Sequence, residues 1–260
     1  MSIRLASRRI PNGRDAASIR KWAMVFMLVG IIGQGVIQNG LLNLNSISGN
    51  ELVDAMDANP AVTTLVTVAL ICKVIETCAA PLLAFLLVEG FQRTSSFEKY
   101  LVRVGGLAVV SEIPYNLAYG GKLLDLGSRN PVFGLFIGLV MLYFFNRYEE
   151  RSIKNTAIKL VIFAAAFLWC QMLGIAQGIC LVTLVGILWL ARTKSEMRAL
   201  YAFMGAMLCT IFSTYYMGCC LSCIMLHRYN QERGEQNKYF NYAFYPAALL
   251  IVGILSRFIG

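Results

Sequence analysis

Apolar residues gather along the chain in long runs separated by short polar segments. A helix needs about 20 mostly apolar residues to cross the hydrocarbon core of a bilayer. Eight runs reach this length or come near it, namely 22–42, 61–91, 100–119, 131–146, 157–172, 174–191, 199–226 and 240–256. Pro81 and Gly218 interrupt the two longest runs, which is typical of kinked or partly re-entrant segments. The pattern predicts an all-α, polytopic transmembrane helical bundle of about eight spans.

The amino-acid composition indicates a lipid environment for these helices. Hydrophobic residues make up 58% of the 260 residues and charged residues only 14%. An average soluble domain has about 25% charged residues, mostly on its surface. So little charge cannot cover a water-facing surface, and we expect an integral membrane protein that contacts the lipid bilayer. No repeat or long linker divides the chain, which predicts a single helical domain over 22–257 behind a basic N-tail over 1–21.

The net charge of +9 does not indicate nucleic-acid binding, because most basic residues lie in the N-tail and in short loops. With eight spans, 17 of the 23 Lys and Arg residues fall on the N-tail side. The first loop on the other side, 43–60, has three acidic residues and no basic one. Cytoplasmic loops carry the excess of Lys and Arg. We therefore expect a bacterial cytoplasmic (plasma) membrane protein with both termini in the cytoplasm.

Two loops leave alternatives open. Loop 227–239 has three basic residues, although eight spans place it outside the cell. If 199–226 were a re-entrant hairpin or two short spans, this loop would be cytoplasmic instead. In the outer loop, Ser48 and Glu51 have the spacing of a helix capping box. That segment is either a short amphipathic helix on the membrane surface or a solvated loop.

Ionisable side chains inside predicted spans are candidates for chemistry, because each costs about 2.5–3.5 kcal/mol to insert. Lys73 and Glu76 share a helix face, which predicts an intramembrane ion pair that neutralises both. Glu112 precedes Pro114, which frees a backbone carbonyl and predicts a helix bend. A carboxylate at such a bend is either a catalytic candidate or a structural hydrogen-bond acceptor. Glu89 is a weaker candidate, because it lies near a helix end where it reaches water.

Cysteine and histidine offer little for metal or nucleophilic chemistry. Residues 219–227 form the pattern C-C-x-x-C-x-x-x-H, but they run down a hydrophobic segment, so we predict no metal site. His227 is the only histidine, and neither a Cys–His pair nor a Ser–His–Asp triad is readily assembled from it. No nucleotide-binding loop is present, which excludes an ATP-driven pump on this chain. The aromatic residues of 239–245 are typical of a membrane-interface belt.

Motifs spread over positions 22–257 resemble those of the TraX family. The first half contains Pro81-Leu-Leu-Ala-Phe-Leu-Leu-Val-Glu-Gly-Phe91, Lys99-Tyr-Leu-Val-Arg103 and Ser111-Glu-Ile-Pro-Tyr-Asn116. The second half contains Tyr229-Asn230, Arg233-Gly234, Lys238-Tyr239 and Phe244-Tyr245-Pro246 in the family's order and spacing. The positions that match the family's motifs are Glu89, Gly90, Arg103, Ser111, Glu112, Pro114, Tyr229, Asn230, Arg233, Gly234 and Pro246.

The resemblance implies an architecture and an activity. TraX proteins are polytopic proteins of conjugation systems, and the founding member is implicated in N-terminal acetylation of pilin. The implied fold is a transmembrane acyltransferase-like bundle that takes acetyl-CoA from the cytoplasm and passes the acetyl group to an acceptor. On this reading Glu112, or more weakly Glu89, is the catalytic base. Arg93 and Arg103 would contact the phosphates of CoA.

The chain departs from the family's pattern in three places. The family's first helix usually carries Asp-His before Ile-Gly, where this chain has Met27-Leu-Val-Gly30-Ile31-Ile32-Gly33. The family's last helix commonly carries a histidine shortly after Tyr-Pro, where Ala247-Ala248 stand here. Glu76-Thr77 replaces Gly-Arg ahead of the Pro81 motif. Because the histidines are missing, we favour a catalytically degenerate membrane protein with a binding or structural role.

Two other functions stay open. The chain could be an active membrane N-acetyltransferase that moves acetyl from acetyl-CoA to a peptide or amine acceptor, with a carboxylate in place of the histidine. It could also be a small-solute transporter. The interruptions in the second and seventh runs fit this function, but the two halves of the chain show no internal repeat. Acetyl-CoA is the only cofactor that the sequence implies, and only for the active enzyme. The sequence identifies no protein partner and no acceptor.

Overall fold

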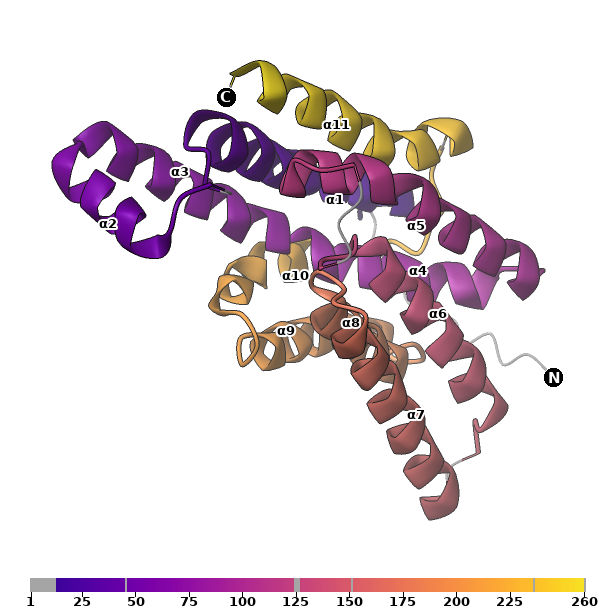
Figure 1. Cartoon of the computed structure of the whole chain (residues 1–260). Helices are drawn as coiled ribbons and strands as arrows, with labels where there is room; N and C mark the ends of the chain where they lie inside the picture. Colours follow the sequence, from indigo (N-terminus) through magenta and orange to yellow (C-terminus); the bar gives the residue numbers. More distant parts are fainter. Residues whose placement is uncertain (1–12, 45, 124–126, 151, 236, 260) are drawn as a thin grey trace.

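The structure is a computed structural model that describes residues 13–259 apart from 45, 124–126, 151 and 236. Most of the predicted basic N-tail therefore lies outside the described residues. Within them the regular structure is helical, apart from isolated bridges between Arg14 and Tyr229 and between Arg129 and Ile175 (Figure 1). The predicted all-α bundle is confirmed.

The helices follow one another with short connections. The first half of the chain forms α1 (Ala16–Ile32), the π-helix η1 (Gly33–Leu41), α2 (Gly49–Ala58), α3 (Pro60–Thr77), α4 (Ala79–Arg93) and α5 (Phe97–Gly120). The second half forms α6 (Val132–Arg147), α7 (Ile153–Met172), α8 (Gly178–Leu190), the 3-10 helix η2 (Ser195–Met197), α9 (Arg198–Cys209), the 3-10 helix η3 (Thr214–Cys219), α10 (Cys220–His227) and α11 (Lys238–Ile259).

Capping residues set the ends of the helices in the first loop. Ser48 N donates to Glu51 Oε2 at 2.7 Å, and Ser48 Oγ accepts from Glu51 N at 3.4 Å. This capping box starts α2, so the loop adopts the helical alternative of the two that the sequence left open. Asn59 then caps α3, with Pro60 in the first turn. α2 buries no residue and packs mainly on α3, and α2 projects from the bundle together with the start of α3 (Figure 1).

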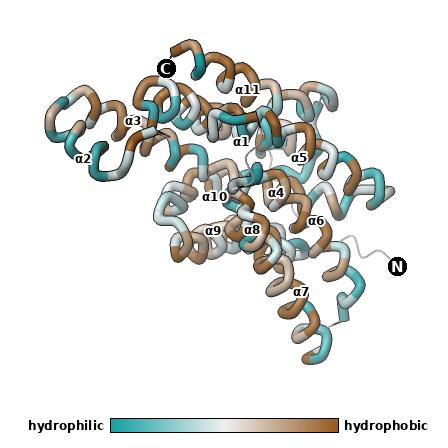
Figure 2. The backbone as a smooth tube through the Cα atoms, in the orientation of Figure 1, coloured by the Kyte–Doolittle hydropathy of each residue, from teal (hydrophilic) through white to brown (hydrophobic). Residues whose placement is uncertain are grey.

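Four helical segments of the described chain are long and apolar enough to cross a membrane, namely Ala16–Leu41, Pro60–Arg93, Ile153–Met172 and Tyr239–Ile259. α6, α8 and α9 are shorter apolar helices. The predicted count of eight spans is not confirmed. Apolar residues run along most helices, as Figure 2 shows, and only 11% of the most apolar part of α7 is buried. Such a surface suits lipid better than water.

The segment predicted as the seventh span enters the bundle and returns. α9 leads inward, η3 forms the tip, and α10 leads back. At the tip, Thr77 Oγ donates to Tyr215 O at 3.0 Å, and the Cys219 thiol donates to Thr77 O at 3.1 Å. At the entrance, the guanidinium of Arg198 lies 5.0 Å from the ring centre of Tyr229, which follows α10. We call α9, η3 and α10 the re-entrant hairpin.

Because the hairpin returns, the loop after α10 lies on the same side as the N-tail. Arg14 N donates to Arg228 O at 2.6 Å, and Ala16 N donates to Glu232 O at 2.9 Å. The basic loop 227–239 therefore lies on the same side as Arg14 and the start of α1, which carries Arg20 and Lys21. The arrangement with a re-entrant segment, one of the two that the sequence left open, is the one that forms.

The two ends of the described chain lie at opposite ends of the bundle (Figure 1). Near the end of α11, Arg257 donates to Gly121 O at 2.9 Å, just beyond α5. Near the end of η1, Asn39 Nδ2 donates to Ala118 O at 2.7 Å on that same side. The expectation that both termini share one side is therefore wrong. The reason is that the chain folds back at the hairpin, where the sequence predicted one continuous span.

Thiol labelling tests this topology. Single cysteines introduced at the exposed positions Asp54, Lys122 and Arg228 are treated with a membrane-impermeant maleimide in intact and in permeabilised cells. We expect Asp54→Cys and Lys122→Cys to react alike and Arg228→Cys to show the opposite accessibility. Equal accessibility of Arg228→Cys and Asp54→Cys would contradict the re-entrant hairpin.

Candidate functional site

A break between α3 and α4 lies at the centre of the bundle. α3 ends at Thr77 and α4 begins two residues later, with Pro81 in its first turn. Proline has no N–H for the carbonyl four residues before it, so Thr77 O loses its helical partner. In lipid such a carbonyl must be satisfied by protein. The Cys219 thiol donates to it from the re-entrant hairpin at 3.1 Å.

Glu76 lies in the last turn of α3, directly before the break, with 11% of its side chain exposed. Lys73 Nζ lies 2.8 Å from Glu76 Oε2 and also donates to Gln34 Oε1 at 3.4 Å. Gln177 Nε2 donates to Glu76 Oε1 at 3.3 Å, and the Tyr216 hydroxyl donates to Gln177 Oε1 at 3.1 Å. A polar chain thus links η1, α3, the start of α8 and the re-entrant hairpin.

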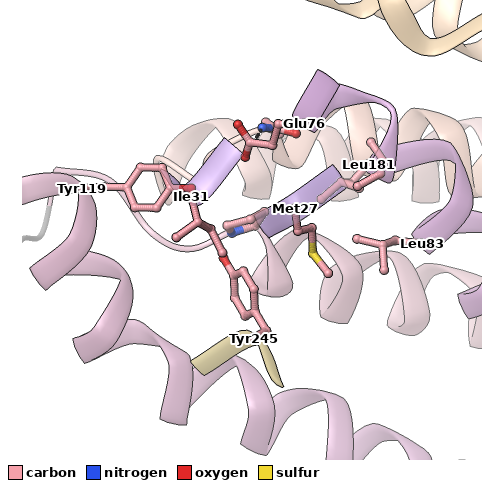
Figure 3. Close-up of a pocket in the computed structure, with 11 residues that line it drawn as sticks. Met27, Ile31, Glu76, Leu83, Tyr119, Leu181 and Tyr245 are labelled. Atoms are coloured by element: carbon pink, nitrogen blue, oxygen red, sulfur yellow. Dashed lines mark hydrogen bonds between the residues drawn. The ribbon is translucent and has the colours of Figure 1, made fainter. Parts of the chain in front are cut away.

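Glu76 also faces a small central cavity of about 30 Å³. Six helices and the start of α6 form its wall, including Met27, Ile31, Leu83, Tyr119, Leu181 and Tyr245 (Figure 3). Both tyrosine rings point into the cavity, and both hydroxyls lie within electrostatic range of the Glu76 carboxylate. A volume of this size holds about two water molecules. We call this space the central cavity.

Gly30 makes room for Glu76. A Cβ atom at position 30 would overlap the Cβ, Cγ and Cδ atoms of Glu76. α1 and α3 therefore approach closely at this point, and the larger side chain comes from α3 alone. Gly30 is buried, and Ile31 beside it is 1% exposed and lines the central cavity.

Glu112 lies apart from Glu76 and holds the start of α6. Its Oε2 accepts from Asn130 N at 3.1 Å and from Asn130 Nδ2 at 2.6 Å. Asn130 Nδ2 also donates to Ala108 O at 2.8 Å, one turn earlier on α5. Glu112 Oε1 is buried and has no hydrogen-bond partner among the described residues. α5 continues without interruption through Pro114.

Glu89 and Arg93 fasten the loop after α10 to α4. Glu89 Oε1 lies 2.5 Å from the Arg93 guanidinium and accepts from the Tyr229 hydroxyl at 2.8 Å. Arg93 also donates to Gln231 O at 2.6 Å. Burial and the neighbouring Glu89 carboxylate raise the pKa of Tyr229 above its ordinary value. The phenol therefore keeps its proton and serves as a hydrogen-bond donor.

The same loop also rests on the start of α1. Asp15 Oδ1 accepts from Ser18 N at 2.7 Å and caps α1. Gly234 has a φ of +67°, and a side chain there would overlap the Asp15 carboxylate. Asn230 Oδ1 accepts from Glu232 N at 2.9 Å and shapes the loop. Hydrogen bonds from Ser18 lower the pKa of Asp15 below its ordinary value of 3.8, so the carboxylate stays charged at neutral pH.

Other sequence candidates lie outside these contacts. Arg103 is exposed on α5, and Gly90 accommodates the Tyr100 hydroxyl, which lies 2.7 Å from the position of a Cβ at residue 90. His227 is exposed at the end of α10. Within the part of the chain that the structure describes, no three His, Cys, Asp or Glu side chains gather as metal ligands would.

Comparison with known protein families identifies the family of this chain. The model of the family described as TraX protein matches residues 16–256, from the start of α1 almost to the end of α11. The chain belongs to the TraX family. No curated protein and no solved structure shows significant similarity to it. The TraX match and the apolar helices together indicate a membrane protein.

Two of the three departures from the TraX pattern meet at the central cavity, and the third follows a cavity residue by one helical turn. When the Ile-Gly of the TraX pattern is matched to Ile32-Gly33, the Asp-His of that pattern falls on Gly30 and Ile31. The glycine that the pattern has ahead of the Pro81 motif falls on Glu76. Gly30 and Glu76 are in direct contact, and Ile31 lines the cavity. Ala248, near the position of the family's second histidine, is buried one turn after the cavity residue Tyr245.

Sequence reasoning missed several residues of this network. Gln34, Gln177 and Tyr216 were not singled out, because each is a lone neutral polar residue near or within an apolar run. Their proximity depends on the re-entrant hairpin and on the turn before α8, where Gln177 has a φ of +56°. An uncharged hydrogen-bonding side chain in an apolar run was the one available signal.

The contact between Gly30 and Glu76 predicts a stability effect. Gly30→Ala should cost about 1–3 kcal/mol through overpacking and lower the melting temperature in detergent. Adding Glu76→Gly removes the overlapping atoms, so the double variant should lose less than the sum of the two single changes. Gly106→Ala is the matched control, because nothing lies within 4 Å of a Cβ there. Equal effects of Gly30→Ala and Gly106→Ala would refute the close contact.

The Asp15 cap predicts a pH effect. Its lowered pKa means that Asp15 contributes stability above pH 3.8, and that this contribution disappears as the pH falls through the folded-state value. Asp15→Asn keeps a capping acceptor without the titration, whereas Asp15→Ala should cost about 1 kcal/mol at pH 7. The melting temperature of the wild type relative to Asp15→Asn should fall between pH 6 and pH 3. A constant difference over that range would show that the charge has no role.

Proposed function

We propose that this TraX-family chain is a catalytically degenerate membrane protein that keeps the acyltransferase-type bundle as a binding or structural component. The observation that supports it is the state of the central cavity. Its one carboxylate, Glu76, is neutralised by Lys73 and bonded by Gln177. Aliphatic side chains stand where the TraX pattern has histidine, at Ile31 and near Ala248.

Acetyl transfer to an amine needs a group that accepts the amine proton. Glu76 offers two oxygens to the cavity region, and each already accepts a hydrogen bond or an ion pair from the protein. Tyr119 and Tyr245 present hydroxyls beside this carboxylate. The Glu76–Lys73 ion pair is largely buried, and both carboxylate oxygens already have partners in the protein. The arrangement has no free base.

The central cavity is also too small for the acyl donor. Ordinary ligand sites have volumes of about 300–1,000 Å³, against about 30 Å³ for the central cavity. Arg93, a sequence candidate for the CoA phosphates, is held by Glu89 and by Gln231 O. Arg103 is exposed on a different helix. These residues do not fit acetyl-CoA, so we derive no catalytic step through it.

The membrane placement that we propose is the bacterial cytoplasmic membrane, with the N-tail in the cytoplasm. The support is the gathering of basic residues on one side. The loop 227–239, which lies beside Arg14 and Ala16, adds to the basic N-tail rather than opposing it. This agrees with the excess of Lys and Arg found on cytoplasmic loops.

One observation favours an active N-acetyltransferase as the second candidate. Glu112 Oε1 is buried without a hydrogen-bond partner among the described residues. Buried polar atoms are nearly always satisfied, so such an oxygen is available to a proton or a bound amine. In this alternative Glu112 accepts the proton of the acceptor amine.

Turnover measurements separate the two functions. The purified chain in nanodiscs is given acetyl-CoA with and without an amine acceptor, as wild type, Glu112→Gln and Glu76→Gln. A TraX-family protein that retains Asp-His in its first helix serves as the positive control. We expect no release of free CoA above the protein-free rate. Turnover that falls about 100-fold or more in a folded Glu112→Gln variant would overturn the proposal and identify an enzyme with a carboxylate base.

A further inference from the structure

A second and larger cavity lies on the N-tail side, away from the central cavity. It has a volume of about 500 Å³ and runs between the first two turns of α1 and the segment that leads into α11. The side chains that give it chemical character are Arg20, Lys21, Glu235, Asn237, Phe240 and Asn241. We call it the basic groove.

The charge of the basic groove favours an anion. Arg20 and Lys21 are neighbours on α1, and Arg233 lies close enough to Arg20 to interact with it electrostatically. Lys21 is exposed, whereas Arg20 is half-buried near Tyr100 and Tyr242. The lining holds two basic side chains and one acid, the exposed Glu235. Guanidinium and ammonium groups placed side by side are the donors that proteins use for phosphate oxygens.

The surroundings of the groove place it at the level of lipid headgroups. Phe240, which lines the groove, is 57% exposed, and Tyr239 and Trp22, next in sequence to the lining residues Phe240 and Lys21, are 88% and 40% exposed. Exposed aromatic rings of this kind lie at membrane–water interfaces. Met24 and Ala17 form a buried apolar floor below the charged rim. A ligand with a charged head and an apolar body matches a charged rim above an apolar floor.

We propose that the basic groove binds the phosphate of an anionic phospholipid. Arg20 and Lys21 donate to the phosphate oxygens. The Asn241 amide and the Nδ2 of Asn237, whose Oδ1 accepts from Tyr239 N and Phe240 N, face the remaining polar part of the headgroup, and Phe240 packs against the start of the acyl chains. A basic pocket between helices on the side of the basic loops is the kind of site that binds such headgroups. The groove shares no residue with the central cavity, so the proposal is independent of acyl transfer.

Lipid retention on the purified full chain tests the proposal. Delipidated protein in mild detergent is titrated with phosphatidylglycerol or with phosphatidylcholine of the same acyl chains, and bound lipid is counted by native mass spectrometry. We expect phosphatidylglycerol to bind more tightly than phosphatidylcholine. Lys21→Gln should weaken phosphatidylglycerol about fivefold, and Arg20→Gln with Lys21→Gln about 25-fold. Lys99→Gln, an exposed charge on α5 outside the groove, should leave it unchanged.

Three results would overturn the assignment. One is equal binding of the two lipids, and another is a loss in Lys99→Gln as large as in Lys21→Gln. The third is stabilisation by inorganic phosphate or free CoA but not by phosphatidylglycerol, which would identify a soluble phosphate ester as the ligand. If Arg20→Gln fails to fold, Lys21→Gln decides alone, because its side chain is exposed. CoA release in the turnover assay reports on the central cavity and does not affect this result.

Discussion

Pro81 has no backbone N–H, so the carbonyl of Thr77 must find its hydrogen bond outside α4. Among membrane helices that partner has to come from protein, because lipid offers none. The Cys219 thiol supplies it from the tip of the re-entrant hairpin, while Thr77 Oγ reaches back to Tyr215 O. The hairpin thus contacts the chain at this break through its tip. Its return then brings Tyr229 to Glu89, which fixes the loop after α10 on the N-tail side.

The same break determines the character of the interior. Glu76 stands in the turn that ends at the break, so its side chain points into the space where α1, α5, α8 and α11 meet (Figure 3). A buried charge without a partner is costly, and Lys73 one turn earlier provides one. Gln177 and Gln34 satisfy the remaining atoms of the pair. The central polar network thus compensates the free-energy cost of burying the Glu76 carboxylate inside a membrane bundle.

The sequence predicted what depends on local pattern. Long apolar runs predicted the helices, the Ser48–Glu51 spacing allowed for α2, and Lys73–Glu76 spacing pointed to one shared face. The topology of 199–226 was not predictable, because a run of that length suits one tilted span as well as a folded-back pair. Only the contact between Thr77 and Cys219, 142 residues apart, decides it. The groove at Arg20 likewise depends on residues from both ends of the chain, which no local pattern connects.

The departures from the TraX pattern differ in what they preserve. At the contact of α1 and α3, the pattern has an acid on the first helix and glycine on the other, whereas this chain has Gly30 and Glu76. One large and one small residue remain, so the helices can still pack closely, and the carboxylate stays in the bundle centre. No such exchange restores an imidazole, since Ile31 and Ala248 only fill space. The contact of α1 and α3 keeps one large and one small side chain but no imidazole, and this supports the proposed binding or structural role.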